Sequence, residues 1–172
     1  DLVRSRGLGD VYKRQRYLRL SAKGCAITVR DLRLYHIAFP ATHITARFAG
    51  QDDAMHRIFD AAVETFRANT VDIYMDCPSR ERAGWLCDSF FTSRVERVLT
   101  GRSDVERAFL QNFLLPEHFA FLPDGMLPMC YPSDHNDRTF IPNWAMWYGV
   151  EMGEYLTRTG DRAFTDSARE RL

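Results

Sequence analysis

The spacing of apolar residues changes near residue 50, and this change limits what the chain can fold into. From Gln51 onward, apolar side chains recur every three or four residues, the spacing that gives a helix one buried stripe. Asp52 and Asp53 precede the first stripe, where carboxylates cap the first backbone N–H groups. A helix is therefore predicted to begin at these aspartates. Its stripe consists of Met55, Ile58, Phe59, Ala62, Val63 and Phe66.

The same spacing predicts four more helices. The second covers about Glu81 to Leu99 and ends at Gly101, and the third begins at Ser103, which can form a capping box with Glu106. A long loop over 116–141 follows, with proline and glycine turn signals. The fourth helix runs from near Pro142 to Gly160, and the fifth opens at about residue 162. The stripe of the fourth contains Trp144, Trp147, Tyr148, Glu151, Met152 and Tyr155.

The chain before residue 50 has the character of strands. Residues 16–20 and 26–35 partly alternate apolar and polar side chains and are rich in β-branched and aromatic types. Because two strands do not form a stable sheet alone, we expect residues 16–45 to be the last strands of a β-domain. Residues 5–15 resemble the translation of a transposon-type sequencing adapter, so residues 1–15 are expected to be non-native.

Composition excludes several classes of protein. The 172 residues carry 23 Lys+Arg and 23 Asp+Glu and are 45% hydrophobic, which excludes disorder and removes the basic surface of a nucleic-acid binder. No apolar run is long enough for a membrane helix. The protein is therefore expected to be soluble, and its compartment, cytoplasmic or periplasmic/secreted, and its oligomeric state stay open. Buried thiols are expected at Cys25, Cys77, Cys87 and Cys130.

The densest group of chemically active side chains lies in the segment DCPSRERAGWLCD, residues 76–88. On a continuous helix Glu81, Trp85 and Asp88 share one face, and Asp76 lies on the loop just before it. Carboxylates around an indole suit a sugar, because the acids hold hydroxyls and the ring stacks on the pyranose. Such acids are equally ordinary as helix caps and surface ion pairs, and the pattern alone leaves both interpretations open.

This segment closely resembles the catalytic motif of bacterial α-L-rhamnosidases, which are inverting glycoside hydrolases of the six-hairpin glycosidase type. Residues 123–128 and 131–132 are also similar to that family, and the resemblance covers roughly residues 16–172. It implies a mainly α fold, in which residues 46–172 form the first helical hairpins of an (α/α)6 barrel. The β-sandwich strands of residues 16–45 would precede this part.

The resemblance also implies residue roles. Glu81 would be the general acid, Asp76 and Asp88 would hold rhamnose hydroxyls, Arg80 would orient sugar and acids, and Trp85 would form an apolar wall. The family's general base is a glutamate beyond the end of this chain. We therefore expect a fragment that holds half of the catalytic pair and is inactive alone, and that takes a carbohydrate substrate and no cofactor.

Other residues allow two interpretations. The aromatic side chains of Tyr131, Trp144, Trp147 and Tyr148 either stack on sugar or pack in the core, and Tyr131 and Trp144 are the best candidates for substrate binding. Residues 134–137 are expected to form a surface turn and no metal site, since they lack the glycine and distal glutamate of a calcium-binding loop. Two other functions stay open: another (α/α)6 glycosidase with a different sugar, or a non-catalytic sugar-binding or structural helical domain.

Overall fold

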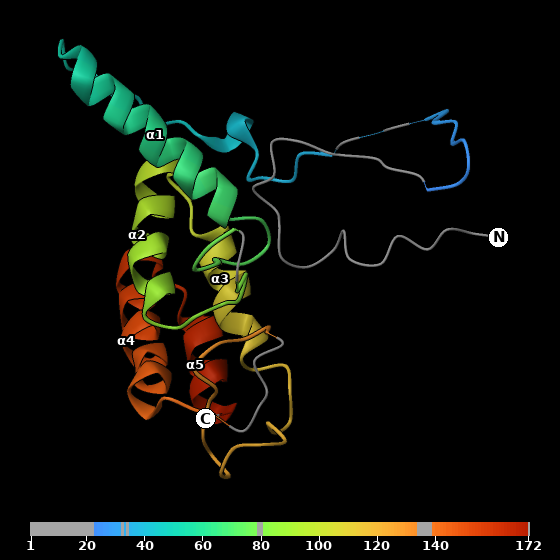
Figure 1. Cartoon of the computed structure of the whole chain (residues 1–172). Helices are drawn as coiled ribbons and strands as arrows, with labels where there is room; N and C mark the ends of the chain where they lie inside the picture. The colour runs from blue at the N-terminus through green and yellow to red at the C-terminus, as the bar shows by residue number, and fades with distance from the viewer. Residues whose placement is uncertain (1–22, 32, 34, 79–80, 134–138, 172) are drawn as a thin grey trace.

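The computed structural model describes residues 23–31, 33, 35–78, 81–133 and 139–171. Five α-helices occur in this part of the chain, and each packs against the next one along the sequence (Figure 1). A short 3-10 helix, Ala41–His43, precedes them. The helices are α1 (Asp53–Asn69), α2 (Asp88–Thr100), α3 (Asp104–Asn112), α4 (Pro142–Thr159) and α5 (Arg162–Arg171).

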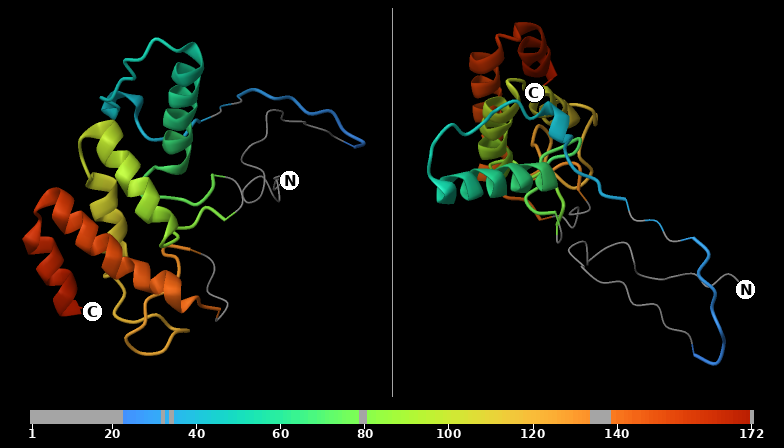
Figure 2. Two further views of the ribbon diagram at one scale, coloured as in Figure 1. Left: turned by 90° about the vertical axis from the view of Figure 1, so that its left-hand side faces the viewer. Right: turned by 90° about the horizontal axis from the view of Figure 1, so that it is seen from above.

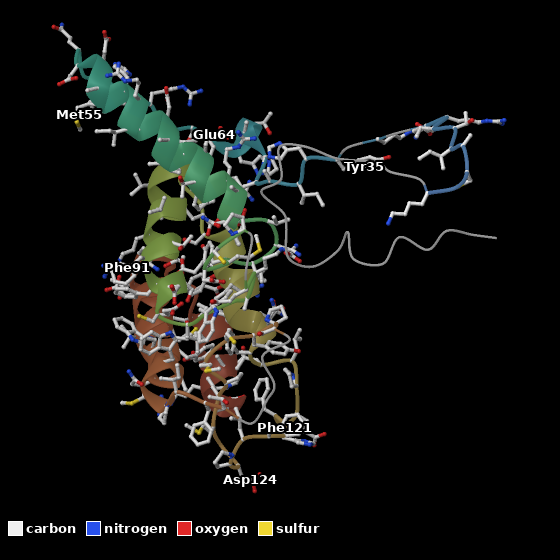
Figure 3. The ribbon with its side chains drawn as sticks, viewed as in Figure 1. Tyr35, Met55, Glu64, Phe91, Phe121 and Asp124 are labelled. Carbon is white, nitrogen blue, oxygen red and sulfur yellow. The ribbon has the colours of Figure 1, made fainter. Side chains whose placement is uncertain are left out.

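Helix α1 begins where the sequence predicts. The Asp52 carboxylate accepts hydrogen bonds from the backbone N–H groups of Ala54, at 2.7 Å, and Met55, at 3.3 Å, and so caps the helix. Only part of the predicted stripe is covered: Phe66 is buried, whereas Ile58 stays 60% exposed. Met55 lies at the end of α1 that points away from the other helices (Figure 3). Helix α1 therefore contributes to the core through Phe66 and, less completely, through Phe59 and Val63, whereas its first turn does not.

Helix α2 begins at Asp88, so the predicted start at Glu81 is wrong. Residues 81–87 form a loop in which Arg82 and Cys87 have positive φ angles of 54° and 76°, which an α-helix does not tolerate. The predicted end is confirmed, because Gly101 follows α2 in the left-handed region with φ 72°. Glu81, Trp85 and Asp88 consequently do not share a helical face, and any meeting of these side chains depends on the loop.

The predicted capping box of α3 is also wrong. The Ser103 side chain makes no capping hydrogen bond. The backbone N–H groups of Val105 and Glu106 instead donate to the carboxylate of Glu96 on α2, both at 3.0 Å. The Tyr74 hydroxyl donates to the same carboxylate. Glu96 therefore caps α3 from a neighbouring helix, and the hairpin between α2 and α3 is held by this side chain.

Helices α4 and α5 begin at the positions that the sequence predicts. Helix α4 has Pro142 at its first position and ends at Gly160, which has φ 72°. The Asp161 carboxylate accepts from the backbone N–H of Phe164 at 3.1 Å and from the Tyr155 hydroxyl at 2.9 Å. Asp161 thus joins the end of α4 to the start of α5.

The core lies where α2, α3 and α4 meet. Its fully buried members come from different helices and pack ring against ring, as in the 5.7 Å separation of the Phe113 and Tyr148 centroids. Tyr148 is a core residue, and the Trp147 ring packs at a tilt against Phe90 with the centroids 4.8 Å apart, which supports the packing interpretation for both. Of the four cysteines only Cys130 is buried, and Cys25 is exposed, so the expected burial is correct for one thiol alone.

The expected β-sandwich strands are not confirmed. Residues 23–31, 33 and 35–50 contain no strand, and residues 16–20 lie outside the described part of the chain. Residues 23–31 run apart from the helices in both orientations (Figure 1, Figure 2). Ile27 and Val29 are each 52% exposed and Tyr35 is 79% exposed, so the described residues leave these apolar side chains largely uncovered.

Replacing Glu96 tests whether its carboxylate holds the α2–α3 hairpin. Glu96→Ala leaves two helix N–H groups and a tyrosine hydroxyl buried without their acceptor, so we expect the free energy of unfolding to fall by about 3 kcal/mol. Asp104→Ala removes an exposed carboxylate at the start of the same helix and should cost less than about 1 kcal/mol. Urea denaturation measures both, and equal losses would contradict the assigned role of Glu96.

Candidate functional site

The loop 81–87 is held by backbone pairing with residues 129–132. Leu86 N–H donates to the carbonyl of Met129 at 3.0 Å, and Tyr131 N–H donates to the carbonyl of Gly84 at 2.9 Å. The two segments approach so closely at Gly84 that a Cβ there would lie 2.4 Å from the Tyr131 carbonyl oxygen. Only glycine fits this contact, and the pairing explains why the segment forms a loop and not a first turn of α2.

Asp76 lies at the other end of the same loop. Its backbone N–H donates to the carbonyl of Ala83 at 3.3 Å, and its carboxylate accepts from the Ala83 N–H at 3.3 Å. These reciprocal hydrogen bonds close the loop between residues 76 and 83. The carboxylate of Asp76 is therefore held at the base of the loop and stays partly exposed.

Asp76 and Asp88 meet in one groove between α1 and α2. The groove has a volume of about 430 Å³. Besides the two aspartates, it is lined by Ala62, Thr65, Phe66, Asn69, Met75, Phe91, Thr92 and Val95. Phe91 projects from the outer face of α2 (Figure 3) and is 60% exposed. The groove thus places two carboxylates beside an apolar surface, which is the combination that a sugar ring needs.

The charges around Asp88 perturb its ionisation. Partial burial raises the pKa of the Asp88 carboxyl above its ordinary value, and the nearby charges of Asp76 and Glu81 raise this pKa further. The hydrogen bond that Asp88 accepts from the side chain of Trp144 on α4 acts in the opposite direction and lowers the pKa. Glu81 therefore lies within electrostatic reach of Asp88, although the two are not on one helix.

Trp85 and Trp144 are not among the residues that line this groove. Both pack against a small buried cluster of Ala83, Met129 and Cys130. Trp85 joins this cluster through its backbone as well, as a bridge partner of Cys130. The loop, the 129–132 segment and the start of α4 therefore meet around the two indoles.

Two of the predicted substrate-binding residues, Tyr131 and Arg80, are not found beside Asp76 and Asp88 in the described structure. The Tyr131 ring packs edge-on against Phe113 and Phe119, with centroids 5.9 and 5.4 Å away, and lines a separate groove with Phe119, Met129 and Thr139. Its side chain thus packs with the loop after α3. Arg80 lies outside the described residues, as does the predicted surface turn at 134–137.

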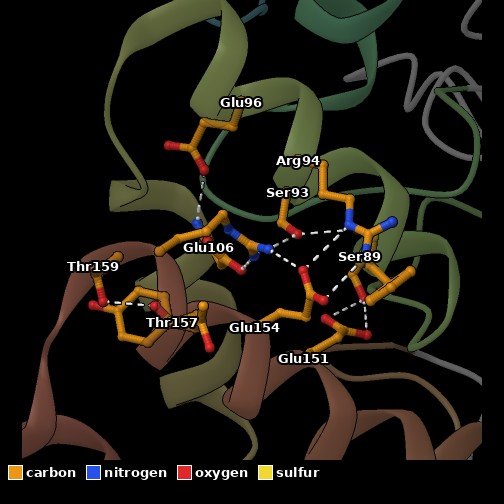
Figure 4. A network of polar contacts seen from close by, with 12 residues as sticks. Ser89, Ser93, Arg94, Glu96, Glu106, Glu151, Glu154, Thr157 and Thr159 are labelled. Atoms are coloured by element: carbon orange, nitrogen blue, oxygen red, sulfur yellow. Dashed lines mark hydrogen bonds and ion pairs between the residues drawn. The ribbon is translucent and has the colours of Figure 1, made fainter.

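Glu151, for which the sequence predicts no role, contacts the residues on either side of Asp88. Glu151 on α4 is 1% exposed, and its carboxylate accepts from the Ser89 hydroxyl at 2.7 and 2.8 Å and from the Cys87 N–H at 3.3 Å (Figure 4). Burial raises the pKa of Glu151 to about 7, while the hydrogen bonds from Ser89 and Cys87 lower it. The signal was present in the sequence, because Glu151 stands among aromatic residues on the stripe of α4.

A family model described as the bacterial alpha-L-rhamnosidase 6 hairpin glycosidase domain matches residues 43–170. The chain belongs to this family. No curated protein matches it, and neither does any solved structure. The matched residues include helices α1 to α4 and all of α5 except its last residue. The described residues are mainly helical, which is consistent with a six-hairpin glycosidase domain, and membership of this family implies a carbohydrate substrate.

Two further findings concern the described residues of this glycosidase domain. None of its helices has the length and apolarity to span a bilayer. No group of three or more His, Cys, Asp or Glu side chains in the described ranges is placed to hold a metal ion.

Removing the indole donor tests the geometry around Asp88. Trp144→Phe keeps a ring but removes the N–H group that stabilises the ionised carboxylate, so we expect the pKa of Asp88 to rise. Trp147→Phe is the matched control on the same helix, because Trp147 packs on Phe90. Carboxyl chemical shifts followed by NMR during a pH titration measure the effect, and equal pKa values in both variants would contradict the hydrogen bond.

The raised pKa of Glu151 predicts a pH dependence of stability. Because folded Glu151 binds its proton more tightly than the unfolded chain does, its stabilising contribution is complete below about pH 4.5 and is lost as the pH rises toward 7. The free energy of unfolding of the wild type, relative to Glu151→Gln, should fall by about 2 to 3 kcal/mol between pH 5 and pH 8. Urea denaturation at both pH values measures this difference, and a constant difference would contradict the assignment.

Proposed function

We propose that this chain is the acid-bearing part of an inverting α-L-rhamnosidase, which hydrolyses terminal α-L-rhamnosyl groups from glycosides or polysaccharides. In this proposal Glu81 protonates the glycosidic oxygen, and Asp76 and Asp88 hold hydroxyls of the rhamnose. The observation that carries it is the groove between α1 and α2, which two of these carboxylates line while the charge of Glu81 acts on one of them. Family membership supplies the reaction class.

The chemistry of the groove supports a deoxy sugar. L-Rhamnose carries a methyl group in place of a hydroxymethyl group, so it offers hydroxyls on one part of the ring and an apolar surface on another. Asp76 and Asp88 provide acceptors for the hydroxyls, and Phe91 and Val95 provide apolar surface in the same groove. We assign Trp85 and Trp144 to the wall of the sugar pocket, Arg80 to the orientation of the acids, and Tyr131 to the outer edge of the substrate site.

Charge also supports a glycosidase mechanism. The transition state of glycoside hydrolysis resembles an oxocarbenium ion and is positively charged, so ionised aspartates near the sugar stabilise it more than the ground state. An inverting reaction further needs a carboxylate base roughly 6.5–9.5 Å from the acid, with a water molecule between them. Glu151 is buried, and Glu154 pairs with Arg94 and Arg158. We therefore propose that neither of these two glutamates is the base.

The assignment of Glu81 is tested with two leaving groups in the full-length protein. Glu81→Gln removes the proton donor, so kcat/KM for an alkyl α-L-rhamnoside should fall by about 10²–10⁴-fold. A dinitrophenyl rhamnoside needs little protonation of its leaving group and should lose much less activity. Glu117→Gln is the control, because Glu117 lines a different groove after α3. An unchanged rate for the alkyl glycoside would exclude Glu81 as the acid.

The sugar itself is tested by comparing aryl α-L-rhamnoside with aryl fucoside and glucoside. Preference for the rhamnoside supports the proposal, whereas preference for another sugar indicates a related six-hairpin glycosidase of different specificity. Binding of sugar without turnover by the full-length protein would indicate a non-catalytic binding domain.

A further inference from the structure

Helix α4 holds the turn that carries Asp88 at three points. The Trp144 side chain donates to the carboxylate of Asp88 itself. Two helical turns later, Glu151 accepts from the residues on either side, the Cys87 N–H at 3.3 Å and the Ser89 hydroxyl at 2.7 Å. Residues seven apart lie on one face of a helix, so a single face of α4 contacts residues 87, 88 and 89.

The turn needs such support because its backbone is strained. Cys87 has a φ of 76°, a conformation that is unfavourable for a residue with a side chain and persists only where surrounding contacts impose it. Cys87 immediately precedes Asp88, the first residue of α2. The direction in which the Asp88 side chain leaves the backbone therefore depends on how residues 87 and 89 are held.

The partners of Glu151 differ from those of its acidic neighbours. Glu106 and Glu154 form ion pairs with Arg158, which joins α3 and α4. Figure 4 shows both glutamates in this polar network. Glu151 instead accepts its hydrogen bonds from Cys87 and Ser89, the two residues that flank Asp88. A buried carboxylate with this set of partners fixes the local geometry of the Asp88 turn.

We propose that Glu151 is a positioning residue for sugar binding, which sets the orientation of Asp88 through the Cys87 N–H and the Ser89 hydroxyl. The inference rests on the proposed role of Asp88 in holding a sugar hydroxyl. Glu151 itself does not touch the substrate, and its effect reaches the sugar through Asp88 alone.

Two serines on α2 give a matched test. Ser89 and Ser93 are both fully buried, but Ser89 contacts Glu151, whereas Ser93 contacts the Phe90 carbonyl and Arg158. Ser89→Ala and Ser93→Ala therefore remove the same atom from the same helix, and only the first releases the Asp88 turn. In Ser89→Ala the Glu151 carboxylate keeps the Cys87 N–H as a donor, so both variants are suited to comparison where Glu151→Ala fails to fold.

The dissociation constant for L-rhamnose, measured by calorimetry on the full-length protein, is the first readout. We expect Ser89→Ala to weaken binding about tenfold, because a displaced Asp88 carboxylate would lose a charge-assisted hydrogen bond to the sugar. Ser93→Ala should change binding less than about twofold, even where thermal unfolding shows that both variants are destabilised. Equal binding by the two variants would overturn the proposal, because a purely structural role would alter stability alone.

The pKa of Asp88, measured by NMR, is the second readout and needs no sugar. If Ser89→Ala displaces the turn, the hydrogen bond from Trp144 weakens and the pKa of Asp88 rises, while Ser93→Ala leaves it unchanged. A shifted pKa in a protein that binds no rhamnose would overturn the role in sugar binding together with the proposed function. An unshifted pKa in a wild type that binds and hydrolyses rhamnosides would overturn the positioning role alone.

Discussion

Three buried glutamates determine how α2, α3 and α4 are arranged. Glu96, Glu106 and Glu151 are each about 1% exposed or less, and burial of an ionised carboxylate costs several kcal/mol unless hydrogen bonds or an opposite charge offset it. Glu96 receives two N–H groups of α3, Glu106 pairs with Arg158 of α4, and Glu151 receives donors at the start of α2 (Figure 4). Because every one of these contacts crosses between helices, the three helices meet in one arrangement that gives each of the three acids a partner on another helix or at its start.

The candidate site depends on this arrangement. The loop 81–87 is fixed on one side by backbone hydrogen bonds to residues 129–132, and Gly84 permits the close approach. On the other side, α4 contacts the start of α2 at residues 87–89. Asp76 and Asp88 therefore line the groove from a loop and from a helix start that are both anchored to the core. Rigid support of this kind matters for a glycosidase, because misplacing a reacting group by about 1 Å costs up to about 100-fold in rate.

Local signals in the sequence predict much of the helical fold but little of how the helices join. Asp52, Gly101 and Gly160 start or end helices as predicted, because each of these three caps is formed by residues adjacent in the sequence. The predicted helix through Glu81 is wrong because Gly84 and Leu86 pair with residues 129–132 instead. These partners are more than 40 residues away in the sequence, so local signals do not reveal them. The capping box at Ser103 fails for a similar reason, since Glu96 reaches the same N–H groups from α2. The segment 76–88 indicates the site by its residue types, whereas the contribution of α4 through Glu151 becomes clear only in three dimensions.

The central claim is that Asp76, Glu81 and Asp88 surround one sugar. A crystal structure of the full-length protein with L-rhamnose bound tests it most directly. We expect the sugar in the groove between α1 and α2, with its hydroxyls within hydrogen-bond distance of the Asp76 and Asp88 carboxylates. The carboxyl group of Glu81 should lie beside the anomeric oxygen. Rhamnose bound elsewhere, with these three carboxylates in solvent, would contradict the account.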